Sequence, residues 1–264
     1  MFLKKKYGQN LLKDTSFIQK MIAVSNISSD CYILEIGPGT GYLTKELLPI
    51  VNKVAAVEID TDFSSILNKL SNSYPDKLSV VYGDIKKCDL NDITGGQTKW
   101  ICFANIPYYI TSPIIELLIE NRHLFTAFYL TIQKEVAERI CAAEGSKHIS
   151  AFTFYTQYYA DCKLNFIIPA IAFEPSPKVD SAFISMKIRE NSPVGLPFDK
   201  IRPIIAKAFE MRRKTVRNSL KSMTGNKDIS AILSDAGVDP DARPQELKIE
   251  DFAEIAKILG KTHE

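Results

Sequence analysis

The sequence predicts an α/β protein with an open, largely parallel sheet of about seven strands, followed by a small all-α domain. Short apolar runs alternate with amphipathic segments over the first two thirds of the chain. A Pro- and Gly-rich break then occupies residues 191–197, and the pattern beyond it has helical spacing throughout. Alternating strand and helix segments are typical of a parallel sheet that helices cover on both faces.

The strands are predicted from short runs rich in β-branched, aromatic and other apolar residues. They are, in chain order, 31–36, 53–59, 78–82, 100–104, 127–132, 162–168 and 182–188. The segments between several of these runs carry apolar residues at helical spacing. The predicted helices are 41–48, 63–73, 112–121, 134–143 and 150–158.

The break at 191–197 is the predicted domain boundary, which gives a first domain at 1–190 and a second at 198–264. We expect the first long helix of the second domain to start at Pro203. Its core-like positions are Ile205, Phe209, Val216 and Leu220. Its basic positions, on another stripe, are Lys207, Lys214, Arg217 and Lys221. One face should therefore pack while the other is cationic.

Composition limits the possible classes of protein. The chain has 264 residues, of which 45% are hydrophobic and 24% charged, as in ordinary globular proteins. No apolar run approaches the roughly 18 residues of a membrane span, and the start lacks the apolar stretch of a signal peptide, so we expect a cytoplasmic protein. The five cysteines and three histidines are scattered without metal-site spacing, so we expect reduced, buried cysteines and no metal.

The net charge is only +2, but it is unevenly distributed. Residues 200–227 contain nine Lys or Arg against Glu210 alone, and residues 1–20 contain five Lys against Asp14. The rest of the chain is acidic. Two basic segments on an otherwise acidic protein indicate a surface that binds a polyanion. The alternative for the longer segment is a solvated helix face.

The quartet Asn105-Ile106-Pro107-Tyr108 directly follows the predicted strand 100–104. In an open α/β sheet, ligands bind at the carboxyl ends of the strands. An amide, a fixed turn and an aromatic ring at that edge suit recognition of the exocyclic amine of a flat base. The alternative is an ordinary turn, since Asn and Pro are common turn residues.

Three further strand ends carry residues suited to a nucleotide-like cofactor. The first strand leads into 35–41, Glu-Ile-Gly-Pro-Gly-Thr-Gly, whose glycines let the backbone approach a ligand at a helix start. This spacing differs from the dinucleotide motif and is typical of S-adenosylmethionine enzymes, although a purely structural turn is the alternative. Glu58 ends the second strand, where it could accept from ribose hydroxyls, and Asp84 follows the third, where it could meet an adenine amine.

These features belong to a longer resemblance that covers essentially the whole chain. The motifs that carry it are 7–12, 35–41, 58–60, 83–84, 105–110, 133–139, 173–181 and 212–218. In these motifs the chain resembles the S-adenosylmethionine-dependent adenine N6,N6-dimethyltransferases of small-subunit ribosomal RNA, the KsgA type. The resemblance implies a Rossmann-like class I methyltransferase sheet in the first domain and an RNA-binding role for the helical second domain.

The resemblance also implies S-adenosylmethionine as the cofactor. The family's cofactor contacts fall on Asn10, Leu12, Gly37, Glu58, Asp84 and Asn105, and we add Gly39 from the same loop. Without the resemblance, Asn10 is better explained as a helix cap. The implied substrate is two adjacent adenosines in a loop near the 3′ end of 16S ribosomal RNA, modified on the immature small subunit during ribosome biogenesis. We expect the enzyme to act as a monomer.

The quartet suggests how such a site works. An adenine amine is a poor nucleophile because its lone pair is delocalised into the ring. We expect the Asn105 side-chain oxygen and the Ile106 carbonyl to accept its two protons, with Pro107 holding Ile106 extended. Tyr108 should stack on the base, and the resemblance suggests Phe173 as a second aromatic, although either could be plain core. A sulfonium methyl group needs good positioning rather than a nucleophilic residue.

A target base must leave its stack to enter such a pocket, which a single-stranded RNA loop makes easier. The residues expected to hold the phosphates, through an attraction that salt weakens, are Lys4, Lys5, Lys6, Lys207, Arg212, Arg213, Lys214, Arg217 and Lys221. At 149–151 the chain has Ile-Ser-Ala where the family commonly has Tyr-Gly-Arg, so a basic residue is missing there. Tyr109 stands where many relatives carry Asn.

Two other functions remain open at this point. The erythromycin-resistance methyltransferases share the fold and the quartet but modify one adenine of large-subunit RNA. Residues 178–181 and the Arg-rich start of the second domain favour the small-subunit enzyme. A non-catalytic RNA-binding or assembly factor could use the same scaffold, but the intact quartet at 105–108 argues against it.

Overall fold

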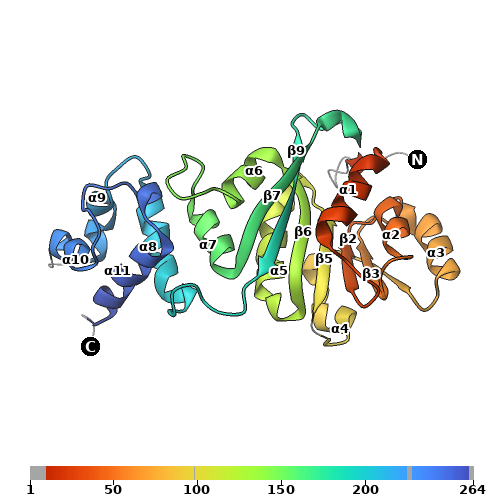
Figure 1. Ribbon diagram of the computed structural model, residues 1–264, viewed down its shortest axis with the longest axis horizontal. Coiled ribbons are helices and arrows are strands. Elements are labelled where there is room, and N and C mark those ends of the chain that lie inside the picture. The colour runs from red at the N-terminus through yellow and green to blue at the C-terminus, as the bar shows by residue number, and fades with distance from the viewer. Residues whose placement is uncertain (1–9, 98, 225–227, 262–264) are drawn as a thin grey trace. The chain divides into compact units, whose positions relative to one another are not determined.

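A computed structural model describes residues 10–97, 99–224 and 228–261. The chain packs into two compact units (Figure 1). Unit 1 consists of the residues up to Ala137 together with Asp161–Ile188. Unit 2 consists of Glu138–Ala160 together with the residues from Arg189 onward.

Unit 1 contains a seven-stranded sheet with the strand order β4-β3-β2-β5-β6-β9-β7 (Figure 1). The strands are β2 (Tyr32–Ile36), β3 (Lys53–Glu58), β4 (Leu78–Tyr82), β5 (Trp100–Asn105), β6 (Phe125–Gln133), β7 (Ala160–Ile168) and β9 (Ser181–Ile188). From β4 to β6 the neighbours run parallel, and β9 pairs antiparallel with β6. The predicted α/β fold with about seven strands is confirmed, and each predicted strand overlaps an observed one.

The central strands form because their residues are apolar on both sides of the pleat. Ile33 and Leu34 are adjacent in β2, so they point to opposite faces, and both are fully buried. Such double burial is characteristic of parallel strands between two helical layers. The core of unit 1 includes Val54 of β3, Phe103 of β5 and Phe183 of β9.

The strands are connected by helices of 5 to 11 residues. They are α1 (Thr15–Ser25), α2 (Tyr42–Leu47), α3 (Ser64–Ser73), α4 (Leu90–Thr94) and α5 (Thr111–Glu120). The sequence analysis did not predict α1 or α4. The cap of α1 is Asp14, whose carboxylate accepts from the Ser16 N–H at 3.0 Å, so the helix-cap alternative for Asn10 is wrong.

Short 3₁₀ turns lie between the main elements of unit 1. They are η2 (Thr61–Phe63), η3 (Ile85–Lys87), η4 (Tyr108–Ile110), η5 (Arg122–Leu124) and η6 (Ala170–Ala172). A second, two-stranded sheet pairs β1 (Leu11–Leu12) with β8 (Phe173–Glu174), and the Lys13 N–H donates to the Ala172 carbonyl at 3.0 Å. This pairing, which the sequence analysis did not predict, ties the start of the described chain to the segment before β9.

Unit 2 is built from helices and the loops that join them, coloured green to blue in Figure 1. The helices are the end of α6 (Lys134–Ile140), α7 (Ala151–Tyr159), α8 (Phe198–Glu210), α9 (Val216–Leu220), α10 (Ile229–Asp235) and α11 (Ile249–Lys261), with 3₁₀ turns at η7 (Lys221–Met223) and η8 (Pro244–Glu246). The predicted second domain omitted α7. In the structure α7 belongs to this unit because Phe154 packs edge-on against Phe252, at 5.1 Å between ring centroids, and Tyr158 lies 5.0 Å from Phe198.

The single long helix predicted from Pro203 to beyond Leu220 is wrong. Helix α8 begins earlier and ends at Glu210, a turn follows, and α9 begins at Val216 with the Thr215 hydroxyl as its cap. The core positions Val216 and Leu220 are nevertheless fully buried. The interruption moves the basic residues between the two helices from a regular stripe into an exposed turn.

Two expectations from composition can be compared with the structure. Of the five free cysteines, Cys102 is buried and the other four are partly exposed, so the expectation that all are buried is wrong for those four. Throughout residues 10–97, 99–224 and 228–261, the helices fall short of the length and apolar character that crossing a membrane requires.

Candidate functional site

The candidate site lies where β2 has β3 on one side and β5 on the other. In the parallel register, Ile36 is opposite Val57 and Ala104, so the residues that follow β2, β3 and β5 meet at one edge of the sheet. From β2 the chain runs outward through β3 to β4 and then returns to β5 on the other side of β2. This reversal of strand order makes the edge the switch point where α/β proteins bind ligands.

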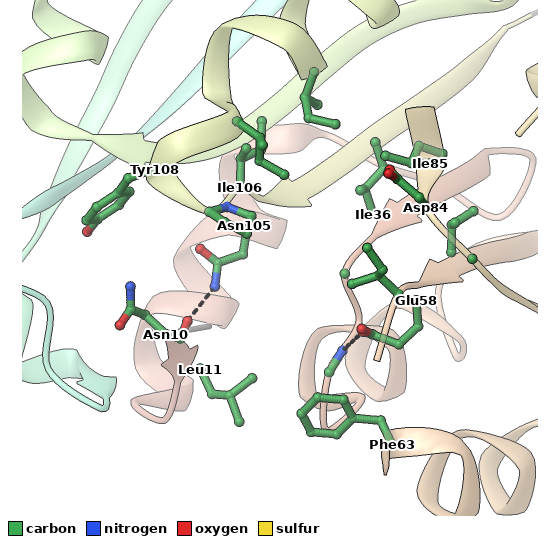
Figure 2. Close-up of a pocket in the computed structure, with 18 of the residues that line it drawn as sticks. Asn10, Leu11, Ile36, Glu58, Phe63, Asp84, Ile85, Asn105, Ile106 and Tyr108 are labelled. Atoms are coloured by element: carbon green, nitrogen blue, oxygen red, sulfur yellow. Dashed lines mark hydrogen bonds between the residues drawn. The ribbon is translucent and has the colours of Figure 1, made fainter. Parts of the chain in front are cut away.

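A pocket of about 850 Å³, including space open to solvent, occupies this edge (Figure 2). Its lining residues come from six of the quoted motifs, 7–12, 35–41, 58–60, 83–84, 105–110 and 173–181, and from residues near them. They are Asn10, Leu11, Ile36, Gly37, Gly39, Val57, Glu58, Ile59, Phe63, Gly83, Asp84, Ile85, Asn105, Ile106, Pro107, Tyr108, Ile110, Ile114, Phe173 and Ser181. The structure therefore brings together every predicted catalytic and cofactor residue except Leu12, which lines an adjoining pocket with Pro38 and Phe103.

The glycine loop forms one wall of the pocket. Gly39 has φ +53°, a conformation that residues with a side chain rarely adopt, and a Cβ atom there would lie 2.8 Å from Leu11 Cδ2. Gly37 has φ +73° at the end of β2. Backbone alone therefore lines this side of the pocket, which is the close approach that a bulky ligand requires.

Glu58 fastens the glycine loop to the end of β3. Its two carboxylate oxygens accept from the backbone N–H groups of Gly39 at 2.9 Å and Asp60 at 2.8 Å, as Figure 2 shows for Gly39. Burial raises the pKa of Glu58, and the two backbone hydrogen bonds act in the opposite direction. Since a carboxylate has about four acceptor sites, two remain for a hydroxyl-bearing ligand.

The far end of the pocket is apolar with a carboxylate at its edge. Asp84 accepts from the Lys86 N–H at 3.1 Å, and its second oxygen lies 3.7 Å from the Lys86 ammonium. The apolar lining residues Ile36 and Ile85 lie beside Asp84 in Figure 2, and Phe63 lies nearer Glu58; Ile59 also lines the pocket. The sequence analysis named Asp84 but missed these neighbours; the position directly after Asp84 pointed to Ile85, whereas no local signal marked Phe63.

Asn105 is held in one orientation by a long-range hydrogen bond. Its Nδ2 donates to the Asn10 carbonyl at 2.9 Å, and Figure 2 shows the amide oxygen turned away from that contact, on the side of Tyr108. Ile106 donates its N–H to the Thr131 carbonyl at 3.0 Å and buries its side chain. Both Asn105 and Ile106 line the pocket, and within the described residues neither the Asn105 side-chain oxygen nor the Ile106 carbonyl oxygen accepts a hydrogen bond.

Two aromatic residues that line the pocket differ in exposure. Tyr108 is half-buried, and burial raises the pKa of its hydroxyl. Its Oη lies 2.8 Å from Ser181 Oγ, a contact that the sequence analysis missed although Ser181 stood within a quoted motif. Phe173 is only 2% exposed and belongs to the core of unit 1, so it forms a wall of the pocket and part of the core.

Glu35 lies behind the glycine loop. It is buried and accepts from the Thr44 hydroxyl at 2.7 Å. Burial raises its pKa to about 7, and the charge of Glu58 adds to this shift, while the hydrogen bond from Thr44 opposes it. Glu35 lines the adjoining pocket with Thr40.

The predicted RNA-binding residues have different surroundings. Lys4, Lys5 and Lys6 lie outside the described residues. Three others are engaged within unit 2: Lys207 pairs with Glu210 and Arg217 with Asp241, each at 2.7 Å, and Arg212 donates to the Lys147 carbonyl. Arg213, Lys214 and Lys221 are exposed, and none of them forms an ion pair with the described residues.

Comparisons with known proteins agree over the whole chain. The family model described as ribosomal RNA adenine dimethylase matches residues 2–261. A protein named ribosomal RNA small subunit methyltransferase A, from Fusobacterium nucleatum, is 40% identical over 260 residues, which are 97% of each chain. The protein of the same name from Nostoc sp. is 37% identical over 267 residues, covering 97% of this chain and 98% of its own.

Solved structures show the same fold. The crystal structure of a dimethyladenosine transferase from Plasmodium falciparum matches with a TM-score of 0.83 and 29% identity, covering 96% of this chain and 98% of the other. The 23S rRNA methyltransferase ErmE matches with a TM-score of 0.75, covering 95% of this chain and all of its own. At 23% identity, that second likeness shows the fold alone.

The buried carboxyl of Glu35 predicts a pH-dependent stability. The pKa of Glu35 is about 7 in the native state, against 4.5 in an unfolded chain. Between pH 4.5 and 7, Glu35 is therefore largely protonated in the native state and largely ionised in the unfolded state. Stability should therefore fall as pH rises from about 4.5 to 7. Glu35→Gln keeps an acceptor for Thr44 and cannot titrate, so its free energy of unfolding relative to wild type should rise by up to about 3 kcal/mol between pH 4.5 and 8.

Urea unfolding at pH 5 and pH 8 measures this difference. Glu116→Gln, at an exposed carboxylate on α5, is the matched control and should show the same difference from wild type at both pH values. A Glu35→Gln difference that stays constant with pH would contradict the prediction.

Proposed function

Since this chain belongs to the ribosomal RNA adenine dimethylase family, we propose that it dimethylates the N6 amines of two adjacent adenosines in 16S ribosomal RNA. The target is a loop near the 3′ end of this RNA, and the methyl donor is S-adenosylmethionine. The observation that carries the proposal is the fixed Asn105 amide, whose oxygen is turned away from Asn10 and toward Tyr108 at the pocket. The second acceptor that we propose is the carbonyl of Ile106, the next residue in the chain.

The chemistry follows from these two acceptors. When an adenine amine donates its two hydrogens to oxygens outside the plane of the base, its nitrogen becomes more tetrahedral and its lone pair leaves the ring. Asn105 can accept without rearranging, because its amide nitrogen is already engaged by Asn10. Preorganised acceptors of this kind lower the barrier without reorganisation during the reaction.

The residues around the glycine loop fit the methyl donor. Bound S-adenosylmethionine supplies an electrophilic methyl group on a sulfonium. Gly37 and Gly39 carry no side chains, so the cofactor can approach the backbone of the loop closely. The two remaining acceptor sites of Glu58 suit ribose hydroxyls. Asp84 and the apolar side chain of Ile85 suit the amine and face of adenine. No titrating base is required, because the methylated amine is acidic once formed.

The RNA around the target base must also be bound, at a surface outside the pocket. We propose that the exposed basic residues of unit 2 contact RNA phosphates, together with the lysines at 4–6. The proposed form of the substrate is the immature small ribosomal subunit, and the enzyme acts on it as a monomer. This substrate goes with the cytoplasmic location that we predict from the sequence.

Two rivals are weaker. A large-subunit methyltransferase of the erythromycin-resistance group shares the fold, but the two relatives described above, at 40% and 37% identity, carry a small-subunit name. Residues 178–181 also favour the small-subunit enzyme. A non-catalytic assembly factor would not need the Asn105 oxygen held free at the pocket, because binding alone makes no use of it.

Purified protein with tritiated S-adenosylmethionine should label immature small ribosomal subunits. Nucleoside analysis should then yield N6,N6-dimethyladenosine, and mass analysis of RNA fragments should place it at two adjacent positions. The control is the large subunit treated in the same way, which should stay unlabelled. Label in large-subunit RNA alone would overturn the proposed substrate, and an absence of label in both would favour the assembly factor.

Replacement of Asn105 tests the acceptor role. Asn105→Ala should lower turnover by about 10², the scale of one lost transition-state hydrogen bond. Asn105→Asp should act only when protonated, because an ionised carboxylate would turn an oxygen toward the Asn10 carbonyl, and two acceptors repel. The ratio of its turnover to wild type should therefore fall as pH rises from 6 to 8.

Single-turnover rates with saturating RNA across this pH range measure both effects, with thermal unfolding as the check on folding. The Asn105→Ala ratio should show no such fall. If Asn105→Ala turns over normally, or if the Asn105→Asp ratio is independent of pH, the proposed orientation of the amide is wrong.

Paired lysine variants test the RNA surface. Lys214→Gln with Lys221→Gln removes two exposed charges without ion-pair partners in the described chain, and should reduce the slope of log affinity against log salt by about 2. The matched control is Lys248→Gln with Lys257→Gln, whose ammonium groups pair with Glu144 and Glu254. RNA affinity measured over a salt series gives these slopes, and the slope of the control variant should equal that of wild type. Equal slopes in both variants would mean that Lys214 and Lys221 are only solvated.

A further inference from the structure

Among the described residues, Ser181 is the one with a buried polar side chain in contact with the Tyr108 ring hydroxyl. It is the first residue of β9, lies opposite Gln133 of β6, and is 1% exposed. Its Oγ is 2.8 Å from Tyr108 Oη. The only other contact of this hydroxyl within the described residues is the Val179 carbonyl at 3.5 Å, at the outer limit for a hydrogen bond.

The other polar groups near this contact are already engaged. The Asp180 carboxylate accepts from the Ala170 N–H at 3.0 Å, and the Asp180 carbonyl accepts from the Lys134 N–H at 3.0 Å. Ser181 is therefore the partner that the Tyr108 hydroxyl depends on. Without it, a partly buried hydroxyl would lose its main hydrogen bond, at a cost of about 1–3 kcal/mol.

Tyr108 is held at both ends when Ser181 is present. At its backbone, the preceding residue is Pro107, whose ring restricts the chain there. The Thr111 hydroxyl also donates to the Tyr108 carbonyl at 3.2 Å. At its tip, Ser181 holds the hydroxyl. A ring anchored at backbone and tip has little freedom to turn, so its face stays directed at the pocket that it lines.

We propose that Ser181 is a positioning residue that holds the Tyr108 ring in place for stacking on the target adenine. This inference rests on the proposed function, in which Tyr108 packs against the base whose amine meets Asn105. Ser181, at the start of β9, would help to align the base, whereas the acceptors at the end of β5 would bind its amine. Ser181 acts through Tyr108 and needs no contact with the reacting atoms.

A double-mutant cycle tests the proposal. Ser181→Ala and Tyr108→Phe each remove one side of the same hydrogen bond, so each should lower kcat about 5- to 30-fold, the equivalent of about 1–2 kcal/mol. The double variant should be no slower than either single variant, because the bond can be lost only once. Binding of S-adenosylhomocysteine, measured by calorimetry, should remain unchanged in all three.

A fluorescent base gives a second readout. RNA with 2-aminopurine at the target position should show its stacking on Tyr108 as quenching, and Ser181→Ala should reduce that quenching. Ser185→Ala is the matched control: Ser185 is also a buried serine of β9, and its replacement should leave kcat and quenching as in wild type.

The outcomes are separable. If wild type methylates the small subunit but the losses from Ser181→Ala and Tyr108→Phe multiply, or if Tyr108→Phe keeps full turnover, Ser181 does not act through Tyr108 and the inference is overturned. Should Ser181→Ala fail to fold, the Tyr108→Phe result alone decides between these outcomes. A wild type without methylation of the small subunit would instead overturn the proposed function.

Discussion

The parallel pairing of β2 with both β3 and β5 is the constraint on which the site depends. Ile33 and Leu34 are buried on opposite faces of β2 between two helical layers, and the register places Ile36 opposite Val57 and Ala104. With the register fixed, the residues after the three strands must lie together: Gly37 after β2, Glu58 at the end of β3 and Asn105 at the end of β5. The packing of the core thus sets the geometry of the pocket.

The functional side chains share one design within that frame. Glu58, Asn105 and Tyr108 each have part of their polar capacity bound to the protein and part left for a ligand. The bound part comes from a segment remote in sequence, such as Asn10 for Asn105 or Ser181 for Tyr108. Precision of this kind needs supporting contacts around the residues that touch the substrate, and here backbone groups supply several of them.

The sequence predicted those parts of the structure that depend on local pattern. The strands followed from their apolar runs, and the site residues followed from their places at strand ends and from the motifs of the family. The pairing of β1 with β8, the Asn10–Asn105 bond and the Ser181–Tyr108 bond join residues that are 73 to 163 positions apart in the chain, so no local pattern reveals them. The helix break after Glu210 was missed because apolar spacing continued in register to Val216 and Leu220.

Neutral hydrogen-bond acceptors, rather than groups that titrate, distinguish the site of this protein. A strongly shifted pKa often marks a catalytic acid or base, and Glu35 has one. Yet its carboxyl is buried behind the glycine loop and bonded to Thr44, so its shift reflects burial. The quartet at 105–108 offers neutral oxygens instead. Attack on a sulfonium methyl group needs an amine whose lone pair is freed, and neutral acceptors achieve this by hydrogen bonding without removing a proton first. The reaction therefore favours acceptors that do not titrate, such as both acceptors of the quartet. The geometry of the site identifies it, and a shifted pKa does not.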